Sequence, residues 1–198
     1  MEAAFFIAAF SALGLNLKKT CPEDLAVMAD AYNKMFPVSW HELHRDAKAL
    51  AWKLVAGGPW HGIVAITRGG LVPAAIVARE LDVRLIDTVS VASYDHMTQN
   101  AGRILKSVSP SVISGDAAQL KNWLIVDDLV DTGGTARIVR ELLPGAHFAT
   151  VYAKPAGKPM VDTYMTEVSQ DTWILFPWDT EPQFAPPIAA ANAPGAAR

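Results

Sequence analysis

The sequence predicts an α/β fold in which a mostly parallel, twisted sheet is flanked by helices. Two observations support this fold class. Short apolar segments rich in β-branched residues alternate along the chain with amphipathic segments of helical period, and this alternation is typical of parallel strands joined by helical connections. The length of 198 residues and the apolar fraction of 51% suffice for one domain with a buried core, and they exclude a largely disordered chain.

The organised part of the sequence begins near Phe36. Ser39, followed three residues later by Glu42, forms a capping-box pattern that predicts the start of a helix. Apolar residues then recur at steps of three and four residues as far as Leu54, and two glycines before Pro59 end the helix.

The next segments predict two strands with a helix between them. Residues 62–67 are a short apolar run of the kind found in buried strands, and residues 68–70 form a loop. Residues 71–81 are expected to be helical, with Pro73 in the first turn, where its missing N–H costs little. A second strand is expected at residues 83–91.

The middle of the chain predicts loops and then two further strands. Residues 93–106 are polar and contain glycine, so we expect an exposed, mobile loop, and residues 107–119 continue this irregular stretch. Strands are expected at residues 123–127 and 147–153, with a helix at residues 136–143 between them.

These elements predict one domain over residues 36–187. Residues 154–187 break into shorter, mixed pieces, and we expect them to form a small hood lobe over the C-terminal ends of the strands. Residues 188–198 are rich in alanine and proline and are expected to be a disordered tail.

Residues 1–35 are expected to be an extension outside this domain. Residues 3–15 are almost all apolar but are too few for a membrane crossing, which needs roughly 20 residues. The only early charge is Glu2, so the pattern does not predict export. Three interpretations stay open: a short helix packed on the domain or on a membrane surface, a poorly ordered extension, or a start codon assigned too early, with Met28 or Met35 as the true start.

Composition narrows the classes of partner. The net charge of −3 gives no basic surplus, so nucleic acid is not expected as a partner. The single cysteine, Cys21, cannot form an internal disulfide, which fits a reducing compartment, and a cytoplasmic location is therefore expected.

The most informative segment is the run IVDDLVDTGGT at residues 125–135. An apolar strand brings Asp127 and Asp128 to its C-terminal end, which is where ligands bind in open α/β sheets. The glycine-rich turn that follows opens a helix, so backbone N–H groups converge on an anion site suited to a phosphate. Because carboxylates would repel that phosphate, we expect them to face hydroxyl groups and Mg²⁺. The segment predicts a site for a sugar phosphate and a metal.

This segment resembles the motif of type I phosphoribosyltransferases that binds phosphoribosyl pyrophosphate (PRPP), and the chain is more narrowly similar to the bacterial xanthine–guanine members. Further matching stretches lie at residues 67–73, 93–96, 153–157 and 170–174. The resemblance covers residues from about 36 to 187 and implies the type I phosphoribosyltransferase fold with its hood.

The resemblance implies an enzyme of purine salvage. With Mg²⁺ as cofactor, it would transfer the phosphoribosyl group of PRPP to N9 of xanthine or guanine, and more weakly of hypoxanthine, giving XMP or GMP and pyrophosphate. It also implies a homotetramer and peripheral association with the cytoplasmic face of the inner membrane. The alternatives are a hypoxanthine-preferring or adenine-type transferase and a PRPP-sensing regulator without catalysis. Lys154 with Trp173 argues against adenine, and residues 1–35 offer no DNA-binding helix-turn-helix.

The resemblance also assigns roles within the PRPP motif. Asp127 and Asp128 would hold the ribose hydroxyls, with Asp128 near the metal, and Asp131 would lie by N7 of the purine as the catalytic base. The rest of the motif would line the PRPP site, with the turn residues around the ribose 5-phosphate: Leu129, Val130, Thr132, Gly133, Gly134 and Thr135.

Other segments would complete the site. Arg68 with Gly69 resembles the pyrophosphate loop, and a cation with a tight backbone after a strand suits a leaving pyrophosphate. Lys154 offers donors only, so it can favour a 6-oxo over a 6-amino purine. Trp173 would stack on the purine, and Ile174 would meet its edge through the backbone.

A flexible loop is expected to close over the reaction and exclude water. Ser93 and Tyr94 match the family in this loop. Where the family has an arginine, the chain has Asn100, and either Arg103 or Lys106 is expected to replace that cation.

Overall fold

A computed structural model describes residues 34–92, 102–113 and 120–179 of the chain. These residues belong to two units, which are described separately. The larger unit is Ser39–Thr172, and the smaller unit contains the described residues before and after it. Among the described residues, no helix is both long and apolar enough to cross a membrane.

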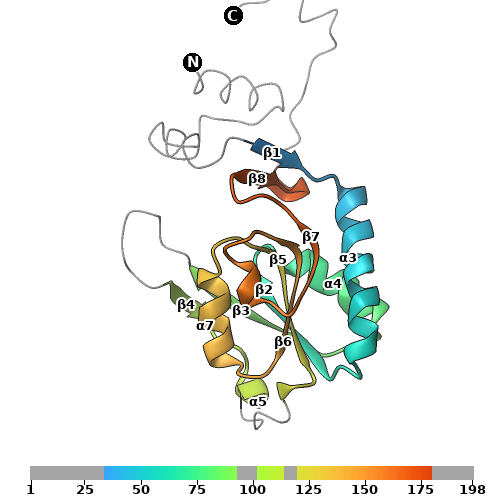
Figure 1. The fold of residues 1–198 in the computed structure, drawn as a ribbon. Coiled ribbons are helices and arrows are strands. Elements are labelled where there is room, and N and C mark those ends of the chain that lie inside the picture. Colours follow the sequence, from blue (N-terminus) through green and yellow to red (C-terminus); the bar gives the residue numbers. More distant parts are fainter. Residues whose placement is uncertain (1–33, 93–101, 114–119, 180–198) are drawn as a thin grey trace, which may run out of the picture. The chain divides into compact units, whose positions relative to one another are not determined.

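The larger unit is built on a six-stranded sheet with the order β4-β3-β2-β5-β6-β7 (Figure 1). Neighbouring strands from β3 to β7 are parallel, and only β4 runs antiparallel to its neighbour. The strands are β2 (Gly62–Thr67), β3 (Ile86–Ala92), β4 (Arg103–Lys106), β5 (Trp123–Val130), β6 (His147–Ala153) and β7 (Thr163–Glu167). The predicted fold class, a mostly parallel sheet flanked by helices, is confirmed.

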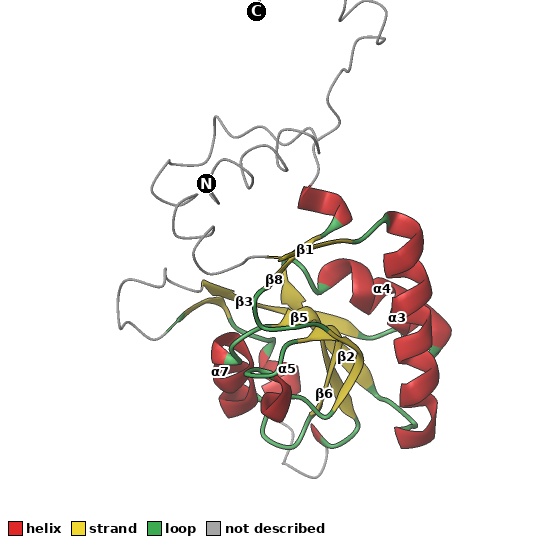
Figure 2. Cartoon of the chain, turned by 45° about the horizontal axis from the view of Figure 1, so that its top comes forward, coloured by secondary structure: helices red, strands yellow, loops and turns green. Residues whose placement is uncertain are grey.

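Helices cover both faces of this sheet (Figure 2). Helices α3 (Trp40–Leu54) and α4 (Leu71–Glu80) lie on one face, and α7 (Gly134–Leu142) with the short α5 (Pro110–Ile113) lies on the other. The 3₁₀ turns are Val55–Gly57, Lys158–Met160 and, in the smaller unit, Pro177–Asp179. The central strands are enclosed on both sides, which is why β2 and the first half of β5 are continuous apolar runs.

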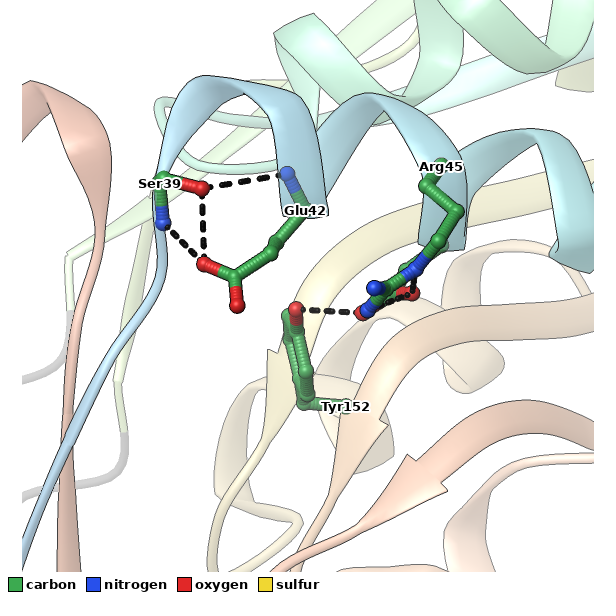
Figure 3. A network of polar contacts seen from close by, with 5 residues as sticks. Ser39, Glu42, Arg45 and Tyr152 are labelled. Carbon is green, nitrogen blue, oxygen red and sulfur yellow. Dashed lines mark hydrogen bonds and ion pairs between the residues drawn. The ribbon is translucent and has the colours of Figure 1, made fainter.

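Helix α3 starts as its sequence predicts, and a side-chain contact ties it to the sheet (Figure 3). The backbone N–H of Glu42 donates to Ser39 Oγ at 3.2 Å, and Ser39 N–H donates to Glu42 Oε2 at 2.8 Å, so the capping box is complete. One turn later, Asp46 accepts a hydrogen bond from the Tyr152 hydroxyl of β6 at 2.9 Å. Burial raises the pKa of the Tyr152 hydroxyl well above its ordinary value, so it stays a donor and ties the helix to the sheet.

Several predicted boundaries are corrected by the structure. Residues 103–106 form β4 instead of a loop, because the open edge of β3 offers backbone partners to a strand too short to show an alternating pattern. The stretch at 107–119 contains α5, which contributes Val112 to the core. β5 extends to Val130, three residues beyond the prediction, and the next helix begins at Gly134.

One segment of the predicted hood, residues 154–187, is corrected. Thr163–Glu167 form β7, which pairs with β6 as an edge strand of the sheet, and the hood formed by the other residues stays a prediction. The smaller unit contains the paired strands β1 (Lys34–Pro37) and β8 (Thr172–Leu175). The predicted tail, and all but two residues of the predicted extension, lie outside the described residues.

Candidate active site

Three of the predicted site segments meet at one edge of the sheet. β5 lies between β2 and β6 and is parallel to both, so the C-terminal ends of these three strands lie together. β2 leads into Arg68, β5 ends in the acidic segment, and β6 leads into Lys154. This is the edge at which open α/β sheets bind ligands.

The turn after β2 lies directly against the acids of β5. A Cβ atom on Gly69 would overlap the Asp128 carboxylate, and a Cβ on Gly70 would lie 2.5 Å from the carbonyl oxygen of Val126. Only glycine allows this close approach. The peptide bond between Thr67 and Arg68 is cis. The contact places the predicted pyrophosphate loop beside the predicted metal ligand, Asp128.

Asp127 and Asp128 form a pair of neighbouring carboxylates at this strand end. Asp127 is only 9% exposed, and its Oδ1 accepts the backbone N–H of Asp128 at 3.0 Å. Burial, and then the negative charge of Asp128, raise the pKa of Asp127 well above its ordinary value. A bound cation or hydroxyl donor would relieve this repulsion, so the pair suits a ligand that brings both.

The donor set fits Mg²⁺ held jointly by the protein and a substrate. No group of three or more His, Cys, Asp or Glu side chains that could enclose a metal occurs in residues 34–92, 102–113 and 120–179. Mg²⁺ is usually bound through one or two carboxylates, with substrate phosphates and water completing its shell. Asp128 would supply the carboxylate.

The turn between β5 and α7 has the geometry of an anion site. Gly133 has a φ of 83°, in the left-handed region that favours glycine, and it precedes the first residue of α7. The first N–H groups of a helix have no partner within the helix, so those of residues 134–136 can face an anion. Met160 lies behind this turn, since a Cβ on Gly133 would come within 2.7 Å of its Cγ.

Asp131 and Lys154 form a buried ion pair next to this turn. Lys154 Nζ lies 2.7 Å from Asp131 Oδ2, and the Lys154 side chain is 1% exposed while that of Asp131 is 28% exposed. The Lys154 N–H also donates to the carbonyl oxygen of Val130 at 2.9 Å. The end of β6 is therefore attached to the end of β5, and a buried ammonium has the counter-charge that it requires.

A third side chain completes this cluster. Gln170 Nε2 donates to Asp131 Oδ1 at 2.6 Å, and Ala156 N–H donates to Gln170 Oε1 at 2.9 Å. Sequence reasoning assigned no role to Gln170, although the residue begins the 170–174 stretch that carries part of the family resemblance. Its place in a stretch that matches the family is the sequence signal that could have indicated a role in the site.

Residues 39–185 match the family model described as the phosphoribosyl transferase domain. This chain belongs to the phosphoribosyltransferase family.

Individual relatives agree with this assignment. The chain is 60% identical over 161 residues to a xanthine-guanine phosphoribosyltransferase of Nitratidesulfovibrio vulgaris (strain DP4), a match that covers 81% of this chain and 94% of that protein. It is also 57% identical over 161 residues to the xanthine-guanine phosphoribosyltransferase of Desulfotalea psychrophila, a match that covers 81% of this chain and 96% of that protein. The fold is similar to that of a purine phosphoribosyltransferase from Pyrococcus horikoshii, with a TM-score of 0.61 and 29% sequence identity. The match covers 77% of this chain and 98% of that protein. The predicted family and fold are confirmed.

The other predicted residues of a phosphoribosyltransferase site are in β8, at the end of β2 or outside the described residues. Trp173 and Ile174 are in β8 and are counted with the smaller unit, where Trp173 is partly exposed and Ile174 is buried. Ser93 and Tyr94 lie outside the described residues. Arg68 is exposed at the end of β2.

The two candidate loop cations are in the edge strand β4. Lys106 Nζ donates to Asp87 Oδ1 at 3.2 Å and to the carbonyl oxygen of Thr88 at 2.5 Å, which ties β4 to β3. Neither Lys106 nor Arg103 is in a loop in this structure, and Lys106 already has a carboxylate partner.

Proposed function

We propose that the chain catalyses transfer of the phosphoribosyl group of PRPP to N9 of xanthine or guanine, and more weakly of hypoxanthine. The products are XMP or GMP and pyrophosphate. The observation that carries this proposal is the ion pair of Asp131 and Lys154 beside the glycine-rich turn. The names of relatives that are 57–60% identical to the chain support it.

The acidic strand end and the two turns would bind PRPP. Asp127 and Asp128 would accept hydrogen bonds from the ribose hydroxyls, and residues 132–135 would hold the 5-phosphate through backbone N–H groups and the hydroxyls of Thr132 and Thr135. Leu129 and Val130 would line this site. Arg68 and the backbone at Gly69 would neutralise the pyrophosphate.

Mg²⁺, held at Asp128 and completed by substrate oxygens, would supply further neutralisation of the leaving group. Our proposal for the metal is supported by the position of the Asp128 carboxylate against Gly69, beside the pyrophosphate loop.

The ion pair matches one edge of a 6-oxopurine. That edge presents a carbonyl acceptor at O6 and, next to it, a nitrogen that can carry a proton at N7. Lys154 offers a donor and Asp131 an acceptor, so the pair is complementary to both groups. The 6-amino group of adenine would instead meet the ammonium of Lys154 with a donor, so two donors would face each other and the amino group would gain no acceptor there. The family resemblance alone supports the last two roles, in which Trp173 would stack on the purine and the backbone of Ile174 would meet the purine edge.

Catalysis would combine orientation with electrostatic stabilisation. The bond between C1 of the ribose and the pyrophosphate oxygen breaks, and the bond between C1 and N9 forms. Asp131 would take the purine proton or stabilise charge on the ring, while Arg68 stabilises the departing pyrophosphate. The two phosphate-binding turns set the distance between the reacting atoms.

A competition between four bases tests the proposal. Xanthine, guanine, hypoxanthine and adenine would be supplied together with PRPP and Mg²⁺, and the nucleotides separated by chromatography. We expect XMP and GMP to dominate, a smaller amount of IMP, and the least AMP. IMP as the main product would favour the hypoxanthine-preferring alternative, and PRPP binding without any nucleotide would favour the sensor.

Assembly and location stay predictions from the resemblance. A homotetramer would be detected by light scattering, and peripheral attachment to the inner membrane by co-sedimentation with vesicles that contain anionic lipid.

A further inference from the structure

We infer that Gln170 is a positioning residue for Asp131, the base of the proposed reaction. Asp131 has a hydrogen-bond donor on each carboxylate oxygen: Lys154 Nζ lies 2.7 Å from Oδ2, and Gln170 Nε2 lies 2.6 Å from Oδ1. Lys154 alone would hold one oxygen and leave the carboxylate able to turn about that contact. The second donor fixes the plane of the group. This inference rests on the proposed function, because it concerns the same base.

The orientation of the Gln170 amide is determined by its other contact. The backbone N–H of Ala156 lies 2.9 Å from Gln170 Oε1, and a backbone N–H can only donate. The amide oxygen must therefore face Ala156, and the NH₂ group must face Asp131. A carboxylate oxygen can only accept when it is ionised, so both contacts of the amide agree with this assignment.

The Gln170 backbone is held independently of its side chain. Ser169 Oγ and Thr172 Oγ1 are 2.7 Å apart, and the Thr172 N–H donates to the carbonyl oxygen of Ser169 at 3.1 Å. These bonds close a turn around Gln170. Since the turn does not need the Gln170 side chain, substitutions at this position should leave the local fold intact.

A neutral donor suits this position better than a charged one. Lys154 already balances the charge of Asp131, and its side chain is buried. A second cation would hold the carboxylate more tightly and make it a weaker proton acceptor, whereas an anion would repel it. The glutamine amide orients the carboxylate without changing the net charge of the cluster.

Two substitutions separate positioning from a structural role. Gln170→Glu keeps an acceptor for Ala156 N–H but faces Asp131 with a carboxylate oxygen, whereas Gln170→Met keeps the length and loses both contacts. If Gln170 positions Asp131, Gln170→Glu is the more damaging change, with kcat lower by about 10- to 100-fold and KM for PRPP within about twofold of wild type. If Gln170 only attaches its segment to Ala156, the order reverses, and Gln170→Met is the worse variant.

Steady-state kinetics of both variants with guanine and PRPP provide the first readout, with thermal unfolding beside them. Lys158→Met is the matched control. Lys158 lies in the nearby 3₁₀ turn and pairs with Glu167, so its loss leaves the contacts among Asp131, Lys154 and Gln170 complete. We expect this control to keep wild-type kcat. Wild-type kcat in Gln170→Glu, or a greater loss in Gln170→Met, overturns the inference.

Crystal structures without ligand keep this test separate from the proposed function. If wild-type protein makes no nucleotide, the proposed function fails, and the inference is then decided by geometry. In Gln170→Glu we expect the Asp131 carboxylate to turn away from residue 170 relative to wild type. A carboxylate that keeps its wild-type position in that variant overturns the inference, whatever the turnover.

Discussion

Two groups of charged residues at the end of β5 differ in how their charge is balanced. Asp131 is held by Lys154 and Gln170, so its negative charge is compensated within the chain. Asp127 lies four residues earlier, and its pKa is raised by burial and by the neighbouring charge of Asp128. The first group is organised before any ligand binds, whereas the second gains from a ligand that brings hydroxyls and a cation. Three substitutions in these two groups and two in β4 test this difference, and the largest effects are expected where the chain supplies the counter-charge.

Asp131→Asn should have the largest effect. We expect kcat to fall by at least about 100-fold, because a positioned acid or base contributes about that much or more. The buried Lys154 ammonium also loses its counter-charge, so the free energy of unfolding should fall by about 2 kcal/mol, less than for a fully buried pair because Asp131 is 28% exposed.

Single-turnover kinetics and denaturant unfolding would measure the two effects of Asp131→Asn. Asp162→Asn is the matched control, since it removes the carboxylate partner of Arg140 away from this cluster. Asp162→Asn should lose stability and keep kcat. Wild-type kcat in Asp131→Asn would contradict the catalytic role.

Lys154→Met should change base preference more than stability. The substitution removes the desolvation cost of the ammonium, and the Asp131 carboxylate left behind is 28% exposed and keeps its Gln170 donor. The free energy of unfolding should therefore change by less than about 1 kcal/mol. We expect kcat/KM for guanine to fall by about 100-fold, because the site loses its donor to O6. The kcat/KM for adenine should not fall in parallel. An equal fall in kcat/KM for guanine and adenine would show that Lys154 does not discriminate between the bases.

Asp127→Asn should act through PRPP. We expect KM for PRPP to rise about tenfold, because a charge-assisted hydrogen bond to a ribose hydroxyl becomes a neutral one. Without ligand, the thermal midpoint should stay unchanged or rise, since the repulsion between Asp127 and Asp128 is removed.

Calorimetry with and without PRPP and Mg²⁺ would separate these two effects of Asp127→Asn. In wild type, PRPP with Mg²⁺ at about 100 times Kd should add about 2.7 kcal/mol of stability. EDTA should remove most of this gain. A lower midpoint for ligand-free Asp127→Asn would show that the pair is not under repulsion.

The smallest effects are expected for the two cations of β4, Lys106 and Arg103. Here too, a charge that is balanced within the chain is compared with one that would be balanced by a ligand. Lys106 already has a partner in Asp87, so Lys106→Met should cost about 1 kcal/mol of stability and leave KM for PRPP unchanged. Arg103→Met should raise KM for PRPP about threefold with no loss of stability. Thermal unfolding of both variants measures the change in stability, and kinetics at varied PRPP measure KM. A larger change in KM for Lys106→Met than for Arg103→Met would assign the pyrophosphate contact to Lys106.

Much of the sheet could be predicted because buried parallel strands are continuous apolar runs. β2 and β6 were located at their observed residues for this reason. The predicted start of β3 is too early, because Val83 is apolar but lies in the turn that follows α4. Asp82 has a φ of 52°, and the Val83 N–H donates to the carbonyl oxygen of Ala78, so the chain turns there before the strand begins.

The site was predicted where its chemistry is local in sequence. Asp127 to Thr135 are consecutive, so the strand, the acids and the glycine turn could be interpreted together. Lys154 was found from the family motif, but its contact with Asp131 depends on the register of β5 and β6. Gln170 reaches the same carboxylate because β7 runs parallel to β6 and brings the chain to the C-terminal edge of the sheet. Contacts made by tertiary structure leave no periodic pattern in the sequence.

The edge strand β4 has a further effect on how the protein behaves at high concentration. It is four residues long, and Arg103 and Lys106 stand at its two ends. An open strand edge can recruit a strand of another molecule, and a short edge with cationic side chains discourages such intermolecular pairing. We therefore expect Arg103 and Lys106 to act as gatekeepers that keep the exposed Ile104 and Leu105 of this edge from pairing with another molecule.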